Sequence, residues 1–252
     1  MEIDQLLENM PSTEGVIVVL SGGMDSTIAT RLCVEKYGKE NVRTLTFFYG
    51  QKQKEEIEKA KLVSKHLDVK HKICDLSVLG DISNGFSANV DNGIDMPSIQ
   101  DVLGDPRPKT YVPNRNMILM SIAASFAEVE NIDTVLMGLQ IHDEYSYHDT
   151  TERFVNKVNS VLAENRIIQI KVVAPFAELS KYDEIKILQE LDGNVDLLKD
   201  TLTCYNPDNK GRSCGRCPSC SERIANFGKA GVEDPIEYSI DIPWEDLIKG
   251  NE

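Results

Sequence analysis

The fold is set by Val16-Ile17-Val18-Val19-Leu20 and, directly after them, Ser21-Gly22-Gly23-Met24-Asp25-Ser26. The five apolar, mostly β-branched residues predict a buried strand. The two glycines let the backbone turn sharply with no side chain above it. A helix is predicted over 27–34, ending before Gly38. Because a helix N-terminus presents unpaired N–H groups and the positive end of a dipole, this strand–turn–helix unit predicts a binding site for a phosphate chain.

The glycine turn differs from two common phosphate-binding motifs. No Gly-Lys-Ser/Thr follows it, which excludes a Walker loop, and it lacks the G-x-G-x-x-G of dinucleotide-binding folds. Ser-Gly-Gly-x-Asp-Ser resembles instead the PP-loop of the ATP pyrophosphatase superfamily. That resemblance implies cleavage of ATP between its α and β phosphates, with AMP left on the substrate. The alternative is an ordinary glycine-rich βα turn without a ligand.

Composition narrows the possible partners. A chain of 252 residues is long enough for one large domain, or one domain with a small appendage. With 27 basic and 41 acidic residues the net charge is −14. Enzymes that bind nucleic acid usually carry a basic face that neutralises its phosphates. We therefore expect a small-molecule substrate and no direct nucleic-acid binding. No run approaches the ~20 apolar residues of a membrane span, and residues 1–5 show no signal-peptide pattern, so a cytoplasmic protein is expected.

Strands and helices alternate along the rest of the chain. Strands are predicted at 42–49, 70–74, 134–137 and 167–173, and helices at 53–67, 117–129, about 150–165, 180–190 and about 217–230. Residues 77–112 lack a clear period and are predicted to be one long loop. The alternation predicts an α/β fold with a doubly wound, mostly parallel sheet of the PP-loop type. Such sheets bind ligands beyond the carboxyl ends of their strands, where the glycine turn, 49–51 and 138–140 would meet.

Four of the six cysteines lie in the spacing Cys204-x9-Cys214-x2-Cys217-x2-Cys220. In a cytoplasmic protein such a cluster indicates a metal more often than disulfides. Four cysteines with no open position predict a structural zinc site, whose binding free energy would fold a segment poor in apolar residues. An iron–sulfur cluster is the alternative, because Cys-x2-Cys-x2-Cys also occurs there. We expect a polar N-terminal extension (1–14), a catalytic domain (15–200), a zinc-binding module packed on it (201–236) and a C-terminal extension (237–252).

Several segments between residues 15 and 236 carry a resemblance that is more specific than the glycine turn. They are Leu-Ser-Gly-Gly-Met-Asp-Ser-Thr at 20–27, Leu-Thr-Phe-Phe-Tyr-Gly-Gln at 45–51, Thr-Tyr-Val-Pro-Asn-Arg-Asn at 110–116, Leu-Ser-Lys at 179–181, Cys-Tyr-Asn-Pro at 204–207, Cys-Gly-Arg-Cys-Pro-Ser-Cys at 214–220 and Ala-Gly-Val-Glu-Asp-Pro at 230–235. Together they resemble the 7-cyano-7-deazaguanine synthases of queuosine biosynthesis.

The resemblance implies a reaction and its cofactors. ATP, bound with Mg²⁺, would activate the carboxylate of 7-carboxy-7-deazaguanine as an acyl-adenylate, releasing pyrophosphate. Ammonia would then displace AMP to give an amide, and a second ATP-driven step would dehydrate the amide to the nitrile. The resemblance also implies a structural Zn²⁺ and a homodimer.

The same resemblance and the glycine turn assign the candidate site residues. Asp25, Lys181 and Arg115 are the expected catalytic residues: Asp25 would reach Mg²⁺, Lys181 would meet the departing pyrophosphate, and Arg115 would pair with a carboxylate or phosphate. The expected ATP-binding residues are Leu20, Ser21, Gly22, Gly23, Met24, Asp25, Ser26, Thr27 and Tyr49. The expected substrate-binding residues are Gln51, Arg115, Gly138 and Asp143. The alternatives are an exposed helix-start lysine for Lys181, a structural loop clamp for Arg115 and a solvated loop acid for Asp143.

The chain departs from the family's pattern in two places. Where the family has Gly-Tyr-Pro-Asp-Cys-Arg-Pro-Glu-Phe, residues 146–154 are Ser-Tyr-His-Asp-Thr-Thr-Glu-Arg-Phe, and Gln53 replaces a histidine. These changes lie where the acceptor or the amine would be handled. An alternative function is therefore that of a defence-associated or phage paralogue, which transfers the adenylated deazaguanine to another amine, such as a protein N-terminus. A third possibility is a regulatory module that binds ATP and zinc without catalysis.

Overall fold

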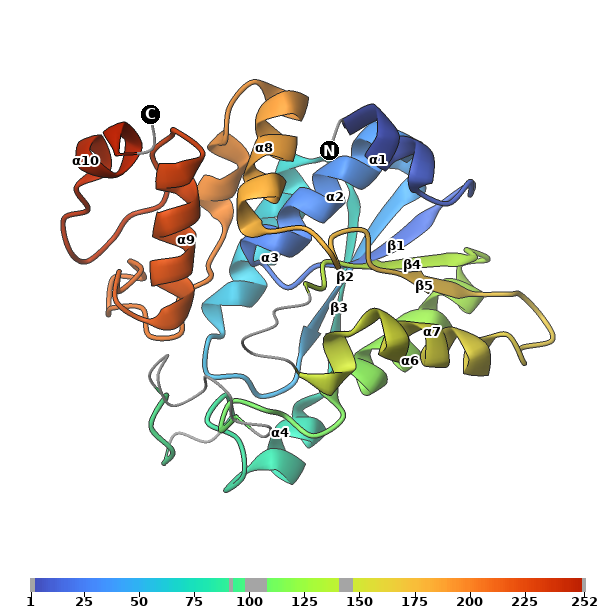
Figure 1. Ribbon diagram of the computed structural model, residues 1–252. Helices are drawn as coiled ribbons and strands as arrows, with labels where there is room; N and C mark the ends of the chain where they lie inside the picture. Colours follow the sequence, from blue (N-terminus) through green and yellow to red (C-terminus); the bar gives the residue numbers. More distant parts are fainter. Residues whose placement is uncertain (1–2, 91–92, 98–107, 141–146, 251–252) are drawn as a thin grey trace.

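The computed structural model describes residues 3–90, 93–97, 108–140 and 147–250 (Figure 1). Within this part of the chain, parallel strands form one five-stranded sheet in the order β3-β2-β1-β4-β5. The strands are β1 (Val16–Val19), β2 (Val42–Phe48), β3 (Lys70–Asp75), β4 (Thr134–Met137) and β5 (Lys171–Val173). The chain adds strands on one side of β1 and then returns to the other side with β4. The predicted doubly wound parallel sheet is confirmed, and its switch point lies between β1 and β4.

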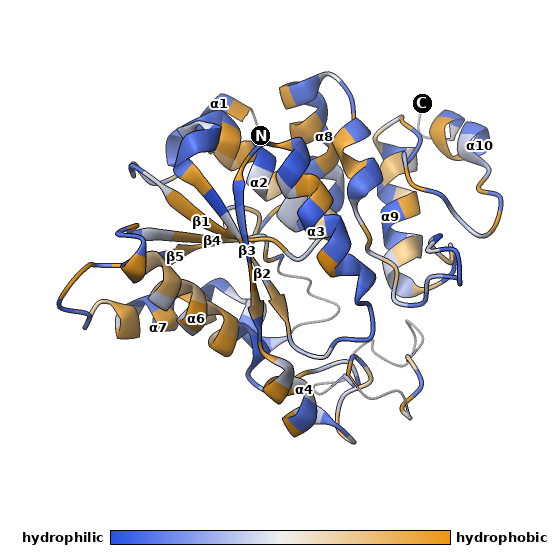
Figure 2. Ribbon diagram, turned by 180° about the vertical axis from the view of Figure 1, so that it is seen from behind, coloured by the Kyte–Doolittle hydropathy of each residue, from blue (hydrophilic) through white to orange (hydrophobic). Residues whose placement is uncertain are grey.

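Helices cover both faces of the sheet (Figures 1 and 2). On one face lie α1 (Ile3–Asn9), α2 (Met24–Tyr37), α3 (Glu55–His66) and α8 (Lys181–Asp192), and on the other α6 (Arg115–Val129) and α7 (Glu152–Leu162). The remaining elements are α4 (Ser77–Ser83), α9 (Pro218–Lys229), α10 (Trp244–Lys249) and the short 3₁₀ helices η1 (Lys39–Asn41), η2 (His148–Thr150) and η3 (Asp196–Asp200). Among the described residues, no helix combines the length and the apolar character that crossing a membrane requires.

Strand β1 is apolar throughout because both of its faces are covered. Val16 and Val18 belong to the core beneath α2 and α8, whereas Ile17 and Val19 belong to the core beneath α6 and α7. Successive side chains of a strand point to opposite faces, so a central strand of a two-sided sheet needs an unbroken apolar run. This requirement explains why the first strand was predictable from five consecutive residues.

Several boundaries differ from the sequence-based expectation. Helix α2 begins at Met24, so residues expected in the turn form its first helical turn. Strand β5 begins at Lys171 rather than at residue 167, because it pairs only with the four-residue β4. Helix α4 interrupts the predicted long loop, and its pattern is weak because only Leu79 and Ser83 are buried. Both ends pack on the protein: Leu6 lies in the core beneath α2, and Trp244 packs against it from α10.

Gly22 sets the path of the chain between β1 and α2. Its φ is +91°, and a Cβ atom there would lie 2.2 Å from the carbonyl oxygen of Glu56. Gly22→Ala should therefore lower the free energy of unfolding by about 3 kcal/mol, from left-handed strain and overpacking together. Gly193 is the matched control, because its φ is +71° but nothing lies within 4 Å of the position that a Cβ atom would take. Gly193→Ala should cost only about 1 kcal/mol in urea unfolding; equal losses would refute the close contact.

Candidate active site

A cavity of about 390 Å³ opens at the carboxyl ends of β1 and β4, next to the switch point of the sheet. It brings together most of the residues predicted from sequence. Those that line it are Ser21, Gly23, Met24, Asp25, Ser26, Tyr49, Arg115, Gly138 and Lys181. Asp143 lies outside the described residues. The cavity therefore joins the glycine turn to residues far away in the chain.

The glycine turn is held rigid by its own side chains. The Ser26 hydroxyl accepts the N–H of Ser21 (3.1 Å) and donates to the carbonyl of Gly23 (3.2 Å). Thr27 donates to the same carbonyl from its backbone N–H and its hydroxyl. Gly23 is the N-cap of α2, and no side chain caps the helix. Because no capping side chain competes for the first N–H groups of α2, this end of the helix is suited to an anion.

Other predicted site residues support the cavity from outside its lining. Leu20 and Thr27 are fully buried. Gln51 is also buried: its amide donates to the carbonyl of Phe47 (3.1 Å) and its oxygen accepts the N–H of Tyr49 (2.8 Å). The Gln51 side chain thus stabilises the turn that carries Tyr49, although the sequence assigned it to substrate binding.

Gly138 allows the end of β4 to approach the start of α2. A Cβ atom at residue 138 would lie 3.0 Å from backbone atoms of both Asp25 and Ser26. Any side chain there would force the two segments apart. The glycine therefore sets the distance between the glycine turn and Gln140, which follows β4 and also lines the cavity.

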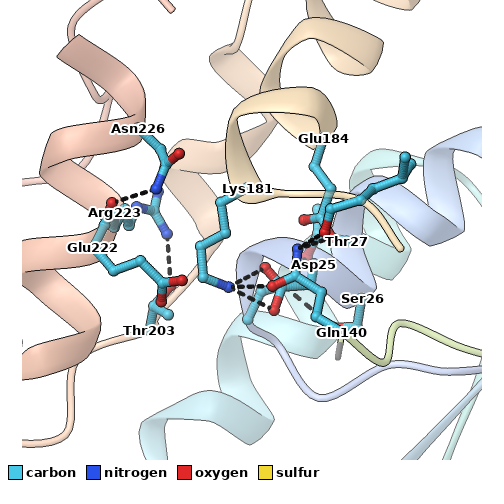
Figure 3. A network of polar contacts seen from close by, with 12 residues as sticks. Asp25, Ser26, Thr27, Gln140, Lys181, Glu184, Thr203, Glu222, Arg223 and Asn226 are labelled. Atoms are coloured by element: carbon cyan, nitrogen blue, oxygen red, sulfur yellow. Dashed lines mark hydrogen bonds and ion pairs between the residues drawn. The ribbon is translucent and has the colours of Figure 1, made fainter. Parts of the chain in front are cut away.

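Lys181 and Asp25 form an ion pair in the cavity (Figure 3). The Lys181 ammonium lies 2.9 and 3.0 Å from the two Asp25 oxygens and 3.1 Å from Oε1 of Gln140. Burial by itself would lower the pKa of Lys181, but Asp25, Glu222 and Glu184 together raise it, so the group stays charged. Lys181 is only 5% exposed, which rules out the alternative of an exposed helix-start lysine.

The start of α8 explains how Lys181 reaches this position. Ser180 caps the helix in a capping box with Asp183, in agreement with the sequence-based expectation. Lys181 is the first helical residue after that cap. Its orientation is consequently fixed by the cap on one side and by Asp25 and Gln140 on the other.

The opposite wall carries Arg115 and Glu56. Arg115 begins α6, and its guanidinium carbon lies 5.9 Å from the centroid of the Tyr49 ring. Burial raises the pKa of Glu56 to about 8, although Arg115 opposes the shift. The next residue, Asn116, donates its N–H to the buried carboxylate of Asp149 (3.3 Å). Residue 149 lies in the segment that departs from the family pattern, so that segment contacts the base of α6 directly.

The four clustered cysteines form a compact donor set. Their sulfur atoms all lie within 4.8 Å of one another, and those of Cys214 and Cys220 are 3.9 Å apart. A tetrahedral zinc site with Zn–S bonds of about 2.3 Å places its sulfurs about 3.8 Å apart. Backbone N–H groups of Asn206 and Cys214 donate to the Cys204 sulfur. The predicted cluster is thus able to hold a metal ion.

A buried ion pair links residues within the cysteine segment (201–236). Arg223 of α9 is 1% exposed and contacts both oxygens of Asp234, at 2.6 and 2.8 Å. Its remaining donors reach the hydroxyls of Thr201 and Thr203, and Asp234 also accepts the Tyr238 hydroxyl. Because the pair is bidentate and its neighbours are satisfied, removal of either partner would leave a buried charge uncompensated.

The cysteine segment also forms one wall of the cavity. Tyr205 follows Cys204 directly, while Ser219 and Glu222 flank Cys220, and all three line the cavity. Gln53, which stands where the family has histidine, is buried and donates its amide to the carbonyl of Tyr205 (2.9 Å). The departure at residue 53 therefore ties the turn after β2 to the segment that carries the cysteines.

Several cavity residues were not predicted. They include Glu56, Tyr205, Ser219 and Glu222, together with Glu184, which bonds just beneath the cavity to Gln140, a residue of the predicted stretch 138–140. Glu184 lies three residues after Lys181, so helical spacing was a usable signal for that residue. Tyr205 and Ser219 lie inside motifs that carry the family resemblance, whereas Glu56 and Glu222 become recognisable only when the fold places them at the cavity.

The chain is similar to one protein family, to curated proteins and to solved structures. The family described as "Queuosine biosynthesis protein QueC" matches residues 15–231. The chain is 38% identical over 231 residues to a 7-cyano-7-deazaguanine synthase of Caldicellulosiruptor saccharolyticus, covering 91% of this chain and 97% of that protein. It is 35% identical to the enzyme of the same name from Methanococcus aeolicus, covering 88% and 98%. Among solved structures, an NH3-dependent NAD synthetase from Campylobacter jejuni is 19% identical, with a TM-score of 0.43 and coverage of 76% and 74%.

Proposed function

The chain belongs to the queuosine biosynthesis protein QueC family of ATP-dependent ligases, and on that basis we propose that it converts 7-carboxy-7-deazaguanine to 7-cyano-7-deazaguanine. The observation that carries the proposal is the Lys181–Asp25 pair beside the uncapped start of α2, within a cavity. A carboxylate is a poor electrophile, and adenylation supplies it with a good leaving group. A site built to neutralise phosphate charge is what that step requires.

The first step is adenylation. A carboxylate oxygen of the substrate attacks the α-phosphorus of ATP, and pyrophosphate leaves with the electron pair of the broken P–O bond. The N–H groups of the glycine turn and of the start of α2 bind the phosphates, and the Lys181 ammonium neutralises the departing pyrophosphate. Arg115 orients the substrate carboxylate from the opposite wall. Asp25 is a partly exposed carboxylate at the cavity, and its oxygens would hold Mg²⁺. The bound Mg²⁺ would offset phosphate charge.

Two further steps complete the conversion. Ammonia attacks the carbonyl carbon of the acyl-adenylate, AMP leaves with the bonding electrons, and loss of a proton yields the amide. The amide oxygen then displaces pyrophosphate from a second ATP, and departure of AMP with loss of protons forms the C≡N bond. The aromatic side chains of Tyr49, Tyr147 and Tyr205 line the cavity and offer flat faces for the deazaguanine ring.

We assign the cysteine cluster to a structural zinc ion. Four cysteines fill a tetrahedral set with no position open for substrate, and the sulfur–sulfur spacing suits Zn–S bonds. Zinc would hold together the segment that carries Tyr205, Ser219 and Glu222. An iron–sulfur cluster would use the same ligands, and elemental analysis of the purified protein separates the two.

A second function is favoured by the altered segment at 146–154. Thr150 lines the cavity at the position where the family has cysteine. Tyr147 and Thr110 share a hydrogen bond, and the Tyr147 ring stacks on Tyr111. The alternative is therefore a paralogue that makes the same acyl-adenylate and delivers it to an amine other than ammonia, such as a protein N-terminus.

The fate of the acyl-adenylate distinguishes the two functions. The protein is incubated with Mg-ATP and 7-carboxy-7-deazaguanine, with ammonium or with a peptide bearing a free N-terminus, and the products are identified by mass spectrometry. Nitrile synthesis predicts two AMP per nitrile formed with ammonium and no peptide adduct. A peptide adduct with one AMP, and no nitrile, would favour the paralogue. If AMP were released but neither ammonium nor the peptide reacted with the acyl-adenylate, both proposed functions would be contradicted.

A further inference from the structure

Glu184 is a buried acid next to the Lys181–Asp25 pair, and nothing in the proposed reaction uses it. It is fully buried in α8, one helical turn beyond Lys181. Its Oε1 atom accepts the Gln140 amide at 2.5 Å. Its Oε2 atom is buried and has no hydrogen-bond donor within the described part of the chain. Figure 3 shows the Glu184 side chain reaching from α8 toward the start of α2, beside Asp25.

We propose that Glu184 carries a proton in the resting enzyme and, as a neutral acid, positions Gln140 and Lys181 for phosphate binding. An ionised Glu184 would set a second negative charge beside Asp25, with one neutral amide as its hydrogen-bond donor and with the Lys181 ammonium already paired to Asp25. A proton on Glu184 would allow its carboxyl group to donate a hydrogen bond to Asp25, with which it interacts. In agreement, burial and then the charge of Asp25 raise the pKa of Glu184 well above its ordinary value.

The hydrogen-bond chain explains why a neutral acid is useful here. Gln140 donates to Glu184 and to the carbonyl of Leu179, so its oxygen must face Lys181. Lys181 therefore has both Asp25 and Gln140 as partners, and the charges of the pair cancel. If Glu184 ionised, the start of α2 would gain a net negative charge and attract phosphate less strongly. Glu184 is thus a positioning residue that acts through Gln140 and Lys181.

The neighbouring charges are few. Asp25 faces Glu184 from α2, Lys181 from its own helix, and Glu222 of α9 acts on Lys181. Arg31 of α2 and Asp192 of α8 pair with each other at 2.7 Å. Asp25 and Lys181 thus dominate the electrostatic surroundings of Glu184.

Stability tests the protonation without using activity. Because the folded state binds the Glu184 proton more tightly than the unfolded chain does, stability from this group is fully present below the unfolded pKa and is lost as the pH rises toward the folded pKa. Glu184→Gln keeps a neutral side chain and does not titrate. Its urea midpoint should therefore rise relative to wild type between pH 5 and pH 8. Glu190→Gln, on the exposed face of the same helix, should show no such trend.

Kinetics tests the positioning role, and this part rests on the proposed adenylation. Wild type should show a KM for ATP that increases at alkaline pH, whereas the KM of Glu184→Gln should stay level. Glu184→Leu, which cannot hold Gln140, should release AMP about tenfold more slowly than Glu184→Gln. If the difference in urea midpoint between wild type and Glu184→Gln did not change with pH, the proposal that Glu184 is protonated would be wrong. Equal rates of AMP release for Glu184→Gln and Glu184→Leu would contradict the positioning role. If wild type itself releases no AMP, the proposed function fails while the stability test still stands.

Discussion

Lys181→Met should lower the rate of adenylation by about 100- to 1000-fold, which is the usual loss when one preorganised donor to a developing negative charge is removed. Lys181 is the cationic group paired with Asp25 in the cavity, beside the start of α2 where we propose that the phosphates bind. Methionine keeps the length and most of the volume of the side chain but cannot neutralise a departing pyrophosphate. The expected loss therefore falls on the rate of AMP release rather than on folding.

The measurement is AMP release under saturating ATP and 7-carboxy-7-deazaguanine, with circular dichroism to confirm that the variant is folded. Lys186→Met is the matched control, because Lys186 is exposed on the same helix. That control should keep the wild-type rate. If a folded Lys181→Met variant were as active as wild type, the phosphate site would lie elsewhere.

Cys217→Ser should remove the metal and unfold the cysteine segment. The apparent free energy of binding a structural zinc is about 10–16 kcal/mol, comparable with or larger than the ~5–15 kcal/mol that stabilises a whole domain. Around the cysteines the segment has few apolar residues: the small core there consists of Leu202, Cys204 and Cys220, whereas Phe227 and Ala230 pack into the main core. Without the metal, burial of so little apolar surface cannot offset the ordering of the loop.

Elemental analysis and limited proteolysis measure this effect. Wild type should contain about one zinc per chain, and Cys217→Ser should contain almost none and be cleaved within 201–236. Because this segment forms one wall of the cavity, AMP release should also fall. Cys74→Ser is the control, since Cys74 lies on β3 away from the cluster. A metal-free Cys217→Ser variant that resisted proteolysis and remained active would refute a structural metal, and iron with sulfide in wild type would refute zinc.

Features set by neighbouring residues were predictable. The first strand and its glycine turn followed from eleven consecutive residues, and the cysteine cluster followed from its spacing. The burial of Lys181 was not predictable, because its partner Asp25 lies 156 residues away in the chain. Gln51 shows that a motif does not reveal what each polar side chain contacts: its amide group bonds to the backbone of Phe47 and Tyr49 in its own turn. Helix α4 was missed because a short helix with few buried positions has almost no periodic signal.

The most direct test of adenylation is the exchange of radiolabelled pyrophosphate into ATP. Reversible formation of an acyl-adenylate predicts exchange only when 7-carboxy-7-deazaguanine is present, with no dependence on ammonia. 7-Deazaguanine without the carboxyl group should support none. Exchange that is unaffected by the carboxylic acid, or its absence while the protein binds both ATP and the acid, would contradict the proposal that this cavity activates a deazaguanine carboxylate.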